Sequence, residues 1–205
     1  MKQNNVHANQ PVSAIILAAG NSVRMGSPKA QLPYGNGKTF AQQVTGNFLA
    51  YGCKPVILVV QEGVDFSGLQ TENLVAVINR AVERGRSYSI HLGMQALPAG
   101  VNCFIHNIDN PFPSTGLLDR MFDALPPDGY TVPVYQGRGG HPILLGSKMI
   151  RTLQGQSEPG DFRQAISGFA RIEVPWLDGR ILWNINTPEE YQRFLLSSGN
   201  QDKLV

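Results

Sequence analysis

Residues 11–29, which read PVSAIILAAGNSVRMGSPK, decide how the rest of the chain is interpreted. They open on an apolar run over residues 12–19 that only Ser13 interrupts. A run this short and this apolar is typical of a strand buried on both faces, as in a parallel sheet. Gly20 then starts a polar loop that carries two cations, and exposed N–H groups after a strand suit phosphates. The stretch therefore predicts a nucleotide site at the end of a buried strand.

Strand-like and helix-like patterns alternate along the remaining sequence. We expect strands at residues 12–18, 55–60, 74–78, 103–108, 130–135, 143–145, 172–174 and 181–185. We expect helices at residues 38–51, 87–97, 114–125 and 162–169, and a last one after Thr187. This order predicts a three-layer α/β/α fold whose sheet is mostly parallel, with antiparallel strands near residues 130–146. One domain over residues 11–199 is expected, between a disordered tail at 1–10 and a second tail at 200–205.

The composition excludes several classes of protein. A formal charge of +2 with 16% charged residues is too balanced to indicate nucleic-acid binding. Cys53 and Cys103 lie in apolar surroundings far apart in the sequence, as free thiols do, and do not form the pattern of a disulfide framework. No signal peptide and no run of transmembrane length is recognisable. We therefore expect a cytoplasmic protein with neither nucleic acid nor membrane as a partner.

Polar side chains follow two of the expected strands. Asp109 comes after residues 103–108, and Asn184 and Asn186 lie at the end of residues 181–185. Ligands of such sheets bind outside the carboxyl ends of the strands, so these groups are expected on one rim. We expect Asp109 to bind Mg²⁺ rather than only to cap a turn. The two asparagines either add amide oxygens to that site or cap the last helix.

Other motifs are weaker. Residues 35–39 resemble the tail of a P-loop, but Leu32 stands where that motif needs glycine. No zinc spacing and no Gly-x-Ser-x-Gly nucleophile motif is present. His141 follows two glycines in a turn that we expect to be flexible, where its imidazole either contacts an acceptor substrate or belongs to an ordinary turn.

Several segments together resemble a known family. Residues 17–29, LAAGNSVRMGSPK, resemble the signature L-A-[AG]-G-x-S-x-R-M-G-x-x-K of the nucleotidyltransferases that make molybdenum-cofactor dinucleotides. Sugar-nucleotide pyrophosphorylases share this signature more loosely. Further segments resemble later motifs of the family in the same order, namely residues 32–40, 85–90, 108–111, 140–142, 160–161 and 184–190. The resemblance extends over nearly the whole chain.

This resemblance implies a Rossmann-like nucleotidyltransferase fold and Mg²⁺-dependent transfer of NMP from an NTP to a phosphorylated small acceptor, molybdopterin being one candidate, with release of pyrophosphate. Ala19 in Leu-Ala-Ala-Gly is similar to the branch that uses CTP, whereas the Asn-x-Asn ending at residues 184–186 is similar to the branch that uses GTP. We favour CTP over GTP. The partner implied by the family is a molybdoenzyme or its chaperone. A sugar-1-phosphate nucleotidyltransferase and an inactive nucleotide-binding regulatory or accessory protein are the alternatives.

The resemblance also implies roles for individual residues. Catalytic roles fall to Arg24, Lys29 and Asp109, with Lys29 near the α-phosphate, and metal ligation falls to Asp109 and Asn186. The acceptor is expected at His141 and Asp161. The expected nucleotide contacts are Leu17, Ala18, Ala19, Gly20, Asn21, Ser22, Arg24, Met25, Lys29, Gly85 and Ser89.

Overall fold

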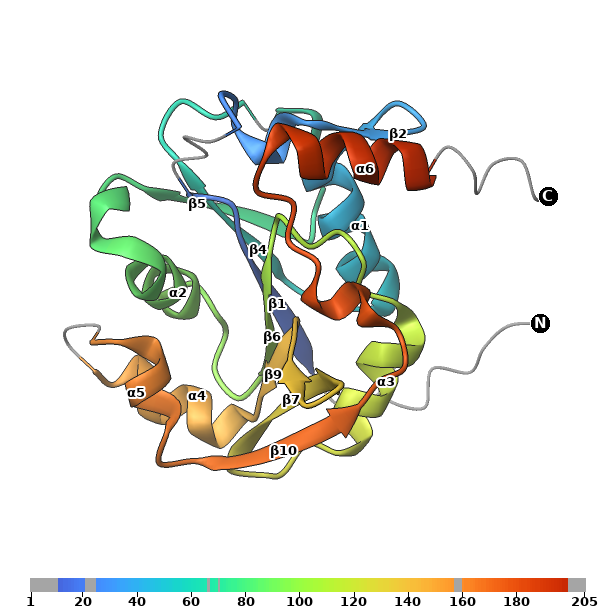
Figure 1. Cartoon of the computed structure of the whole chain (residues 1–205). Coiled ribbons are helices and arrows are strands. Elements are labelled where there is room, and N and C mark those ends of the chain that lie inside the picture. Colours follow the sequence, from blue (N-terminus) through green and yellow to red (C-terminus); the bar gives the residue numbers. More distant parts are fainter. Residues whose placement is uncertain (1–10, 21–24, 66, 70, 157–159, 199–205) are drawn as a thin grey trace.

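The chain folds around one large twisted sheet (Figure 1). The computed structural model describes residues 11–20, 25–65, 67–69, 71–156 and 160–198. Within these ranges the sheet has eight strands, in the order β10-β7-β9-β6-β1-β4-β5 with β8 paired to β7. The strands are β1 (Val12–Leu17), β4 (Val56–Gln61), β5 (Leu74–Asn79), β6 (Asn102–Asn107), β7 (Gly129–Tyr135), β8 (Arg138–Gly139), β9 (Ile143–Leu145) and β10 (Ala170–Pro175). Only β8 and β9 among them run against the others, so the predicted mostly parallel sheet is confirmed.

Helices cover both faces of this sheet. In Figure 1, α2, α4 and α5 lie on one side and α1, α3 and α6 on the other. The helices are α1 (Phe40–Tyr51), α2 (Gly85–Gln95), α3 (Thr115–Asp123), α4 (Ser147–Gln154), α5 (Phe162–Ile166) and α6 (Pro188–Ser198). The predicted three-layer α/β/α architecture is therefore confirmed.

Strand β1 lies at the centre of the sheet and contributes to a hydrophobic core on each face. Ala14 and Ile16 belong to the core under α1 and α3, whereas Ile15 and Leu17 belong to the core under α2 and α4. Neighbouring side chains of a strand point to opposite faces, so a strand buried on both sides must be apolar throughout. This requirement explains the unbroken apolar character of residues 14–19.

Several predicted boundaries are wrong. The helix expected from residue 38 begins at Phe40, because Lys38–Thr39 form β3, which pairs with β2 (Pro33–Gly35) in a small hairpin. Thr39 then caps α1 in a capping box with Gln42. The helices expected at 87–97 and 162–169 end earlier, at Gln95 and Ile166, and helix α4 was not predicted.

The strand expected at residues 181–185 is also wrong. The chain there forms a single-turn 3-10 helix, η4 (Gly179–Leu182), and continues without regular structure to α6. Asp178 starts this turn, because its side chain accepts a hydrogen bond from the Arg180 N–H. Ile181 and Ile185 are buried in a hydrophobic core, so the apolar residues that resembled a strand serve as packing contacts.

No helix in the ranges that the structure describes combines the length and the apolar character needed to cross a bilayer. The arrangement of the strands positions the site. Strands β1 and β6 are parallel neighbours, and each ends in a polar loop at the same edge of the sheet. The segment after η4 reaches this edge too, where the Ile185 N–H donates to the Asp109 carbonyl at 2.8 Å.

Candidate active site

A cavity of about 430 Å³ lies at the carboxyl ends of β1 and β6. Its walls come from the end of β1, the start of α2, the loop after β6 and the segment before α6. Seven of the expected nucleotide contacts line it, namely Leu17, Ala18, Ala19, Gly20, Lys29, Gly85 and Ser89. The expected metal ligands Asp109 and Asn186 line the same cavity, so the sequence motifs converge at one rim as anticipated. Their chemical roles remain predictions.

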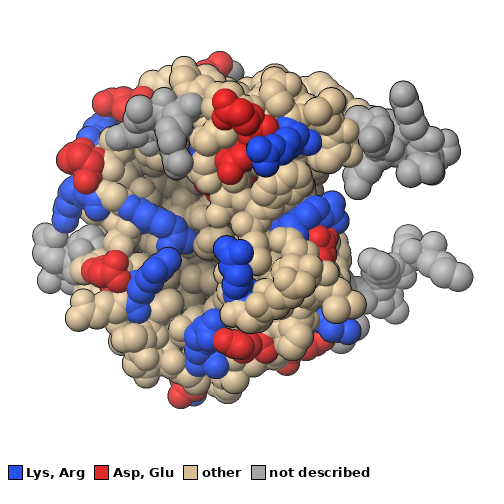
Figure 2. Space-filling model, viewed as in Figure 1, with Lys and Arg blue, Asp and Glu red and all other residues tan. Residues whose placement is uncertain are grey.

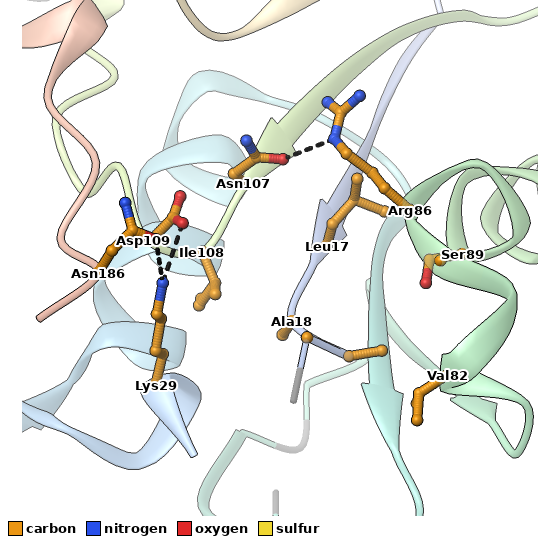
Figure 3. A pocket seen from close by; sticks show the side chains of 13 residues that line it. Leu17, Ala18, Lys29, Val82, Arg86, Ser89, Asn107, Ile108, Asp109 and Asn186 are labelled. Carbon is orange, nitrogen blue, oxygen red and sulfur yellow. Dashed lines mark hydrogen bonds and ion pairs between the residues drawn. The ribbon is translucent and has the colours of Figure 1, made fainter. Parts of the chain in front are cut away.

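Lys29 connects the two expected metal ligands (Figure 3). Its ammonium Nζ lies 3.1 Å from Asp109 Oδ2 and 2.7 Å from Asn186 Oδ1. The side chains of Lys29 and Asp109 are only 14% and 18% exposed, so water screens this ion pair weakly. A positive charge therefore lies between a carboxylate and an amide oxygen, where a bound cation would also be stable.

The second carboxylate oxygen of Asp109 also favours a cation. Asp109 Oδ1 is buried and has no hydrogen-bond partner among the described residues. A buried carboxylate oxygen without a donor is unfavourable, and a hard divalent cation would stabilise it. The described residues contain no group of three or more His, Cys, Asp or Glu side chains that could hold a metal alone. Mg²⁺ fits such a sparse set, because it commonly keeps several waters and binds one or two carboxylates plus phosphates of a substrate.

Asn186 is held in place from behind. The Glu190 carboxylate accepts from the N–H groups of Asn186 at 2.6 Å and Thr187 at 3.1 Å, while the Thr187 hydroxyl accepts from the Glu190 N–H. This reciprocal arrangement is a capping box at the start of α6. The predicted capping role of Thr187 fits these contacts, and the Asn186 side chain remains directed at Lys29.

The opposite wall of the cavity is formed by α2 and the turn before it. Ser89 is buried, and its hydroxyl accepts from Asn79 Nδ2 at 2.9 Å. Gly85 adopts a φ of 80°, a backbone conformation that favours glycine and that lets the chain enter α2 directly from the preceding turn. Together with the small side chains of residues 18–20, this wall leaves room for a flat group such as a base.

Some expected contacts do not belong to this wall. Asn21, Ser22 and Arg24 lie outside the described residues, so their predicted roles have no structural test here. Met25 is half-buried and is not among the residues that line the cavity. Val82, Arg86, Asn107 and Ile108 do line it and were not predicted. Arg86 could have been predicted as a lining residue, because it directly follows Gly85 inside a segment that resembles a nucleotide motif.

A second cavity of about 520 Å³ adjoins the first, and Arg86 and Asn107 line both. His141 and Asp161, the expected acceptor contacts, line this second cavity. Figure 2 shows that this face of the molecule is hollowed at its centre and that Lys and Arg side chains lie around the hollow. The positive rim suits an anionic guest.

His141 differs from expectation. It does not lie exposed on a flexible turn, but is half-buried, and its Nε2 lies 3.1 Å from Asn107 Nδ2. Burial, together with the charges of Arg86 and Arg163, lowers the pKa of His141 to about 4. The imidazole is therefore neutral near pH 7. The His141 N–H donates to the Ile181 carbonyl at 3.0 Å, which joins the turn to η4.

Asp161 has a structural contact beside its expected role. Its carboxylate accepts from the Gln164 N–H at 2.9 Å and so caps α5. The Ser87 hydroxyl accepts from the Phe162 N–H at 3.0 Å, which joins the start of α5 to α2. Asp161 thus borders the second cavity as part of a helix cap.

Comparisons with known proteins agree with this geometry. The sequence profile described as the MobA-like NTP transferase domain matches residues 14–171. The molybdenum cofactor cytidylyltransferase of Escherichia coli K12 is 26% identical over 183 residues, which cover 88% of this chain and 93% of that protein.

Solved structures share the fold. Rv0371c of Mycobacterium tuberculosis superposes with a TM-score of 0.76 at 21% identity, covering 91% of this chain and 98% of that one. A second structure of Rv0371c is a complex with manganese. A nucleotidyl transferase from Methanothermobacter gives a TM-score of 0.74 at 22% identity, covering 91% of this chain and 99% of that one.

Proposed function

The chain belongs to the MobA-like NTP transferase family, and we propose that it transfers NMP from an NTP to a phosphorylated small-molecule acceptor and releases pyrophosphate. The observation that carries this proposal is the convergence of Lys29, Asp109 and Asn186 beside a cavity walled by small residues at the end of β1. One cation and two hard oxygen ligands at the mouth of a base-sized cavity suit the α-phosphate of a nucleotide.

On the nucleotide side, the small side chains of Ala18, Ala19 and Gly20 leave the β1 end open to the base, and Leu17 closes its apolar floor. Lys29 lies at the cavity beside Asp109 and Asn186 and would hold the reacting phosphate as a point charge. The carboxylate of Asp109 and the amide oxygen of Asn186 would hold Mg²⁺. The metal would supply charge neutralisation on the phosphates.

The chemistry needs positioning more than acid–base groups. An oxygen of the acceptor's phosphate attacks the α-phosphorus in line with the bond to the β-bridging oxygen, and pyrophosphate leaves. The attacking oxygen is already anionic, so no general base is required. Catalysis then rests on alignment of the two substrates and on the positive groups that face the transferring phosphate.

We propose CTP as the favoured nucleotide and molybdopterin as the leading candidate acceptor. Support comes from Ala19 in the first motif and from the similarity to a molybdenum cofactor cytidylyltransferase at 26% identity. Asn184 and Asn186 favour GTP instead, since they resemble the ending of the guanylyltransferase branch. On this proposal a molybdoenzyme or its chaperone would receive the product.

A thermal-shift series with Mg²⁺ and each of the four NTPs tests the nucleotide. A ligand at a hundred times its Kd stabilises the folded state by about 2.7 kcal/mol, so the preferred NTP is expected to raise the melting temperature most. A response to GTP alone would exclude CTP as the preferred nucleotide.

Pyrophosphate release tests the reaction itself. The protein, Mg²⁺ and the preferred NTP are mixed with molybdopterin, with a panel of sugar 1-phosphates, or with no acceptor. Release that requires molybdopterin supports the proposal, and release with a sugar 1-phosphate identifies the alternative enzyme. Tight NTP binding without release across the whole panel would show an inactive nucleotide-binding protein and would refute the proposed transfer.

A further inference from the structure

The second cavity carries more positive than negative charge. Arg86, Arg163 and Arg171 line it, and Asp161 is the acidic residue among the described residues that do so. The Asp161 carboxylate is engaged in the cap of α5, as described above. The cavity is therefore electropositive before any ligand enters, and an anion would be attracted into it.

The three arginines are not equivalent. Arg171 forms an ion pair with Glu173, which neutralises much of its charge. Neither Arg86 nor Arg163 forms a salt bridge with any residue in the part of the chain that the structure describes. Burial lowers the pKa of Arg86, and the nearby charge of Arg163 lowers it further. The charge of Asp109 acts on the Arg86 pKa in the opposite direction, with a smaller effect. Arg86 and Arg163 therefore still repel each other, and an anion between them would relieve that repulsion.

A hydrogen bond at Nε orients the Arg86 side chain. Its Nε–H donates to Asn107 Oδ1 at 3.3 Å (Figure 3). The Asn107 amide therefore presents Nδ2 to His141, whose Nε2 accepts at 3.1 Å because the imidazole is neutral. With Nε engaged, the terminal Nη groups of Arg86 remain as a planar fork of donors, the geometry that phosphate oxygens match.

Arg86 also stands where the two cavities meet, since it and Asn107 line both. A phosphate held by Arg86 would lie beside the position of the NTP α-phosphate. The rest of the second cavity has a partly apolar wall that includes Tyr130, Val132 and Phe162. Such a wall suits a ring or another apolar body attached to the phosphate.

We propose that Arg86 and Arg163 form the subsite that binds the phosphomonoester of the acceptor, with the body of the acceptor against Tyr130 and Phe162. This subsite names the residues that bind the acceptor's phosphate in the proposed function and rests on that function. In the transfer, an oxygen of the bound monoester dianion forms a bond to the α-phosphorus, and the bond from that phosphorus to the β-bridging oxygen breaks with its electron pair on pyrophosphate. In the product, a phosphoanhydride bond joins the acceptor to NMP. The step needs no proton and no oxidant.

Binding of inorganic phosphate tests the subsite without turnover. Phosphate is titrated into the protein while Mg²⁺ and a non-hydrolysable α,β-methylene analogue of the preferred NTP fill the first cavity. Arg163→Gln and Arg86→Gln are each expected to weaken phosphate binding about tenfold or more, because each removes a charge-assisted contact. Arg171→Gln is expected to weaken it less, since Glu173 already compensates that charge. Arg151→Gln, on the exposed side of α4, is the matched control and is expected to have no effect.

Steady-state kinetics then separate this subsite from the proposed function. Arg163→Gln is expected to raise KM for the acceptor and leave KM for the NTP unchanged, because Arg163 lines only the second cavity. Arg86→Lys is expected to restore only part of the phosphate affinity, since an ammonium lacks the planar fork. Circular dichroism and melting temperatures equal to those of the unaltered protein show that each variant is folded.

Each failure points to a different error. Phosphate affinity that is the same in the unaltered protein, Arg86→Gln and Arg163→Gln would overturn the subsite, even if the enzyme releases pyrophosphate normally. A loss of phosphate affinity in Arg171→Gln as large as the loss in Arg163→Gln would also overturn the subsite. Phosphate binding that depends on Arg86 and Arg163, in a protein that turns over no NTP, would refute the proposed function and keep the anion subsite.

Discussion

At the scale of single residues, Lys29 contacts the same oxygens that a metal would bind. Its ammonium lies 3.1 Å from Asp109 Oδ2 and 2.7 Å from Asn186 Oδ1. On the proposed function, a divalent cation would compete with Lys29 for these oxygens until a nucleotide phosphate draws the ammonium away. We predict that Lys29→Ala binds Mn²⁺ more tightly in the absence of nucleotide, measured by isothermal titration calorimetry.

The same variant is expected to lose activity. Removal of one electrostatic contact to a reacting group costs about a hundred- to a thousandfold in kcat, so pyrophosphate release by Lys29→Ala should fall by that factor while the fold survives. Lys38→Ala, an exposed lysine of β3, is the control for both measurements. Near-normal turnover by Lys29→Ala, or weaker Mn²⁺ binding, would refute this role.

Two histidines, the buried His106 and the half-buried His141, make stability depend on pH. Burial lowers the pKa of His106 to about 3 and that of His141 to about 4, against 6.5 for an unperturbed histidine. Between about pH 6.5 and pH 4 the unfolded chain therefore binds more protons at these sites than the folded one, and stability falls as the pH falls. Each histidine is expected to contribute a slope of up to about 1.4 kcal/mol per pH unit in that window.

Urea denaturation at several pH values checks this slope in the unaltered protein, in His106→Gln and in His141→Gln. Carboxylates also titrate at the acid end, so the difference between each variant and the unaltered protein is the relevant quantity. Each substitution should flatten the dependence between pH 6 and pH 5, where free carboxylates contribute little. A dependence that neither substitution changes would show that these imidazoles are protonated in the folded state.

Residue identity alone predicted which motifs would meet, but not every side chain that faces the ligand. Asp109 and Asn186 were expected at one rim because each was expected to follow a strand of the sheet. The structure brings both to Lys29, although the strand before Asn186 does not form. Arg86 and Asn107 were not predicted to line the cavity. Their position there depends on the direction in which the start of α2 and the end of β6 face. The burial of His141 could not be foreseen, since it comes from contact with the distant residue Ile181.

At the scale of elements, the position of α2 depends on one small residue. A Cβ on Gly93 would lie 2.6 Å from Ile15 Cγ2 and 3.2 Å from Val59 Cγ2, so the helix lies directly on β1 and β4. Both atoms belong to β-branched side chains with 0% exposure, which have little room to move. We predict that Gly93→Ala lowers the free energy of unfolding by about 1–3 kcal/mol, as overpacking of a core does.

Gly46 in the middle of α1 is the matched comparison. A Cβ there would meet nothing within 4 Å, so Gly46→Ala adds helix propensity without a clash. It is expected to stabilise the protein by about 0.5–1 kcal/mol. Urea denaturation of both variants gives the two free energies directly. A Gly93→Ala protein as stable as Gly46→Ala would mean that α2 does not lie as close to β1 as described.

Sequence patterns predicted the elements that are apolar on both faces or strongly periodic, and failed where tertiary contacts decide. The buried runs of β1, β4 and β6 could be read because a central parallel strand must be apolar throughout. The run at residues 181–185 is equally apolar, but it packs its isoleucines into a core without joining the sheet. Helix α4 forms but was not predicted, because its apolar face consists of only three residues, Met149, Ile150 and Leu153.

At the scale of the whole molecule, one sheet joins two separate hydrophobic cores. Cys53 belongs to the core under α1 and α3, and Cys103 to the core under α2 and α4, and both have 0% exposure. Burial raises the pKa of both thiols, so neither is reactive in the folded state. The two cysteines therefore report separately on the opening of each face of the sheet.

We predict that both thiols become reactive only through the same global unfolding, because β1 contributes side chains to both cores and neither can open while the other stays intact. Labelling by an alkylating reagent, followed by mass spectrometry of the two peptides, gives each opening free energy after normalisation to the unfolded chain. The two values should agree. Mg²⁺ with the preferred NTP at a hundred times its Kd should slow both labelling rates about a hundredfold, since the ligand binds only the folded state. Cys103 labelling much faster than Cys53, or protection of Cys103 but not of Cys53 by the nucleotide, would show that the layer under α2 opens independently of the rest. That layer carries Gly85 and Ser89, which line the first cavity.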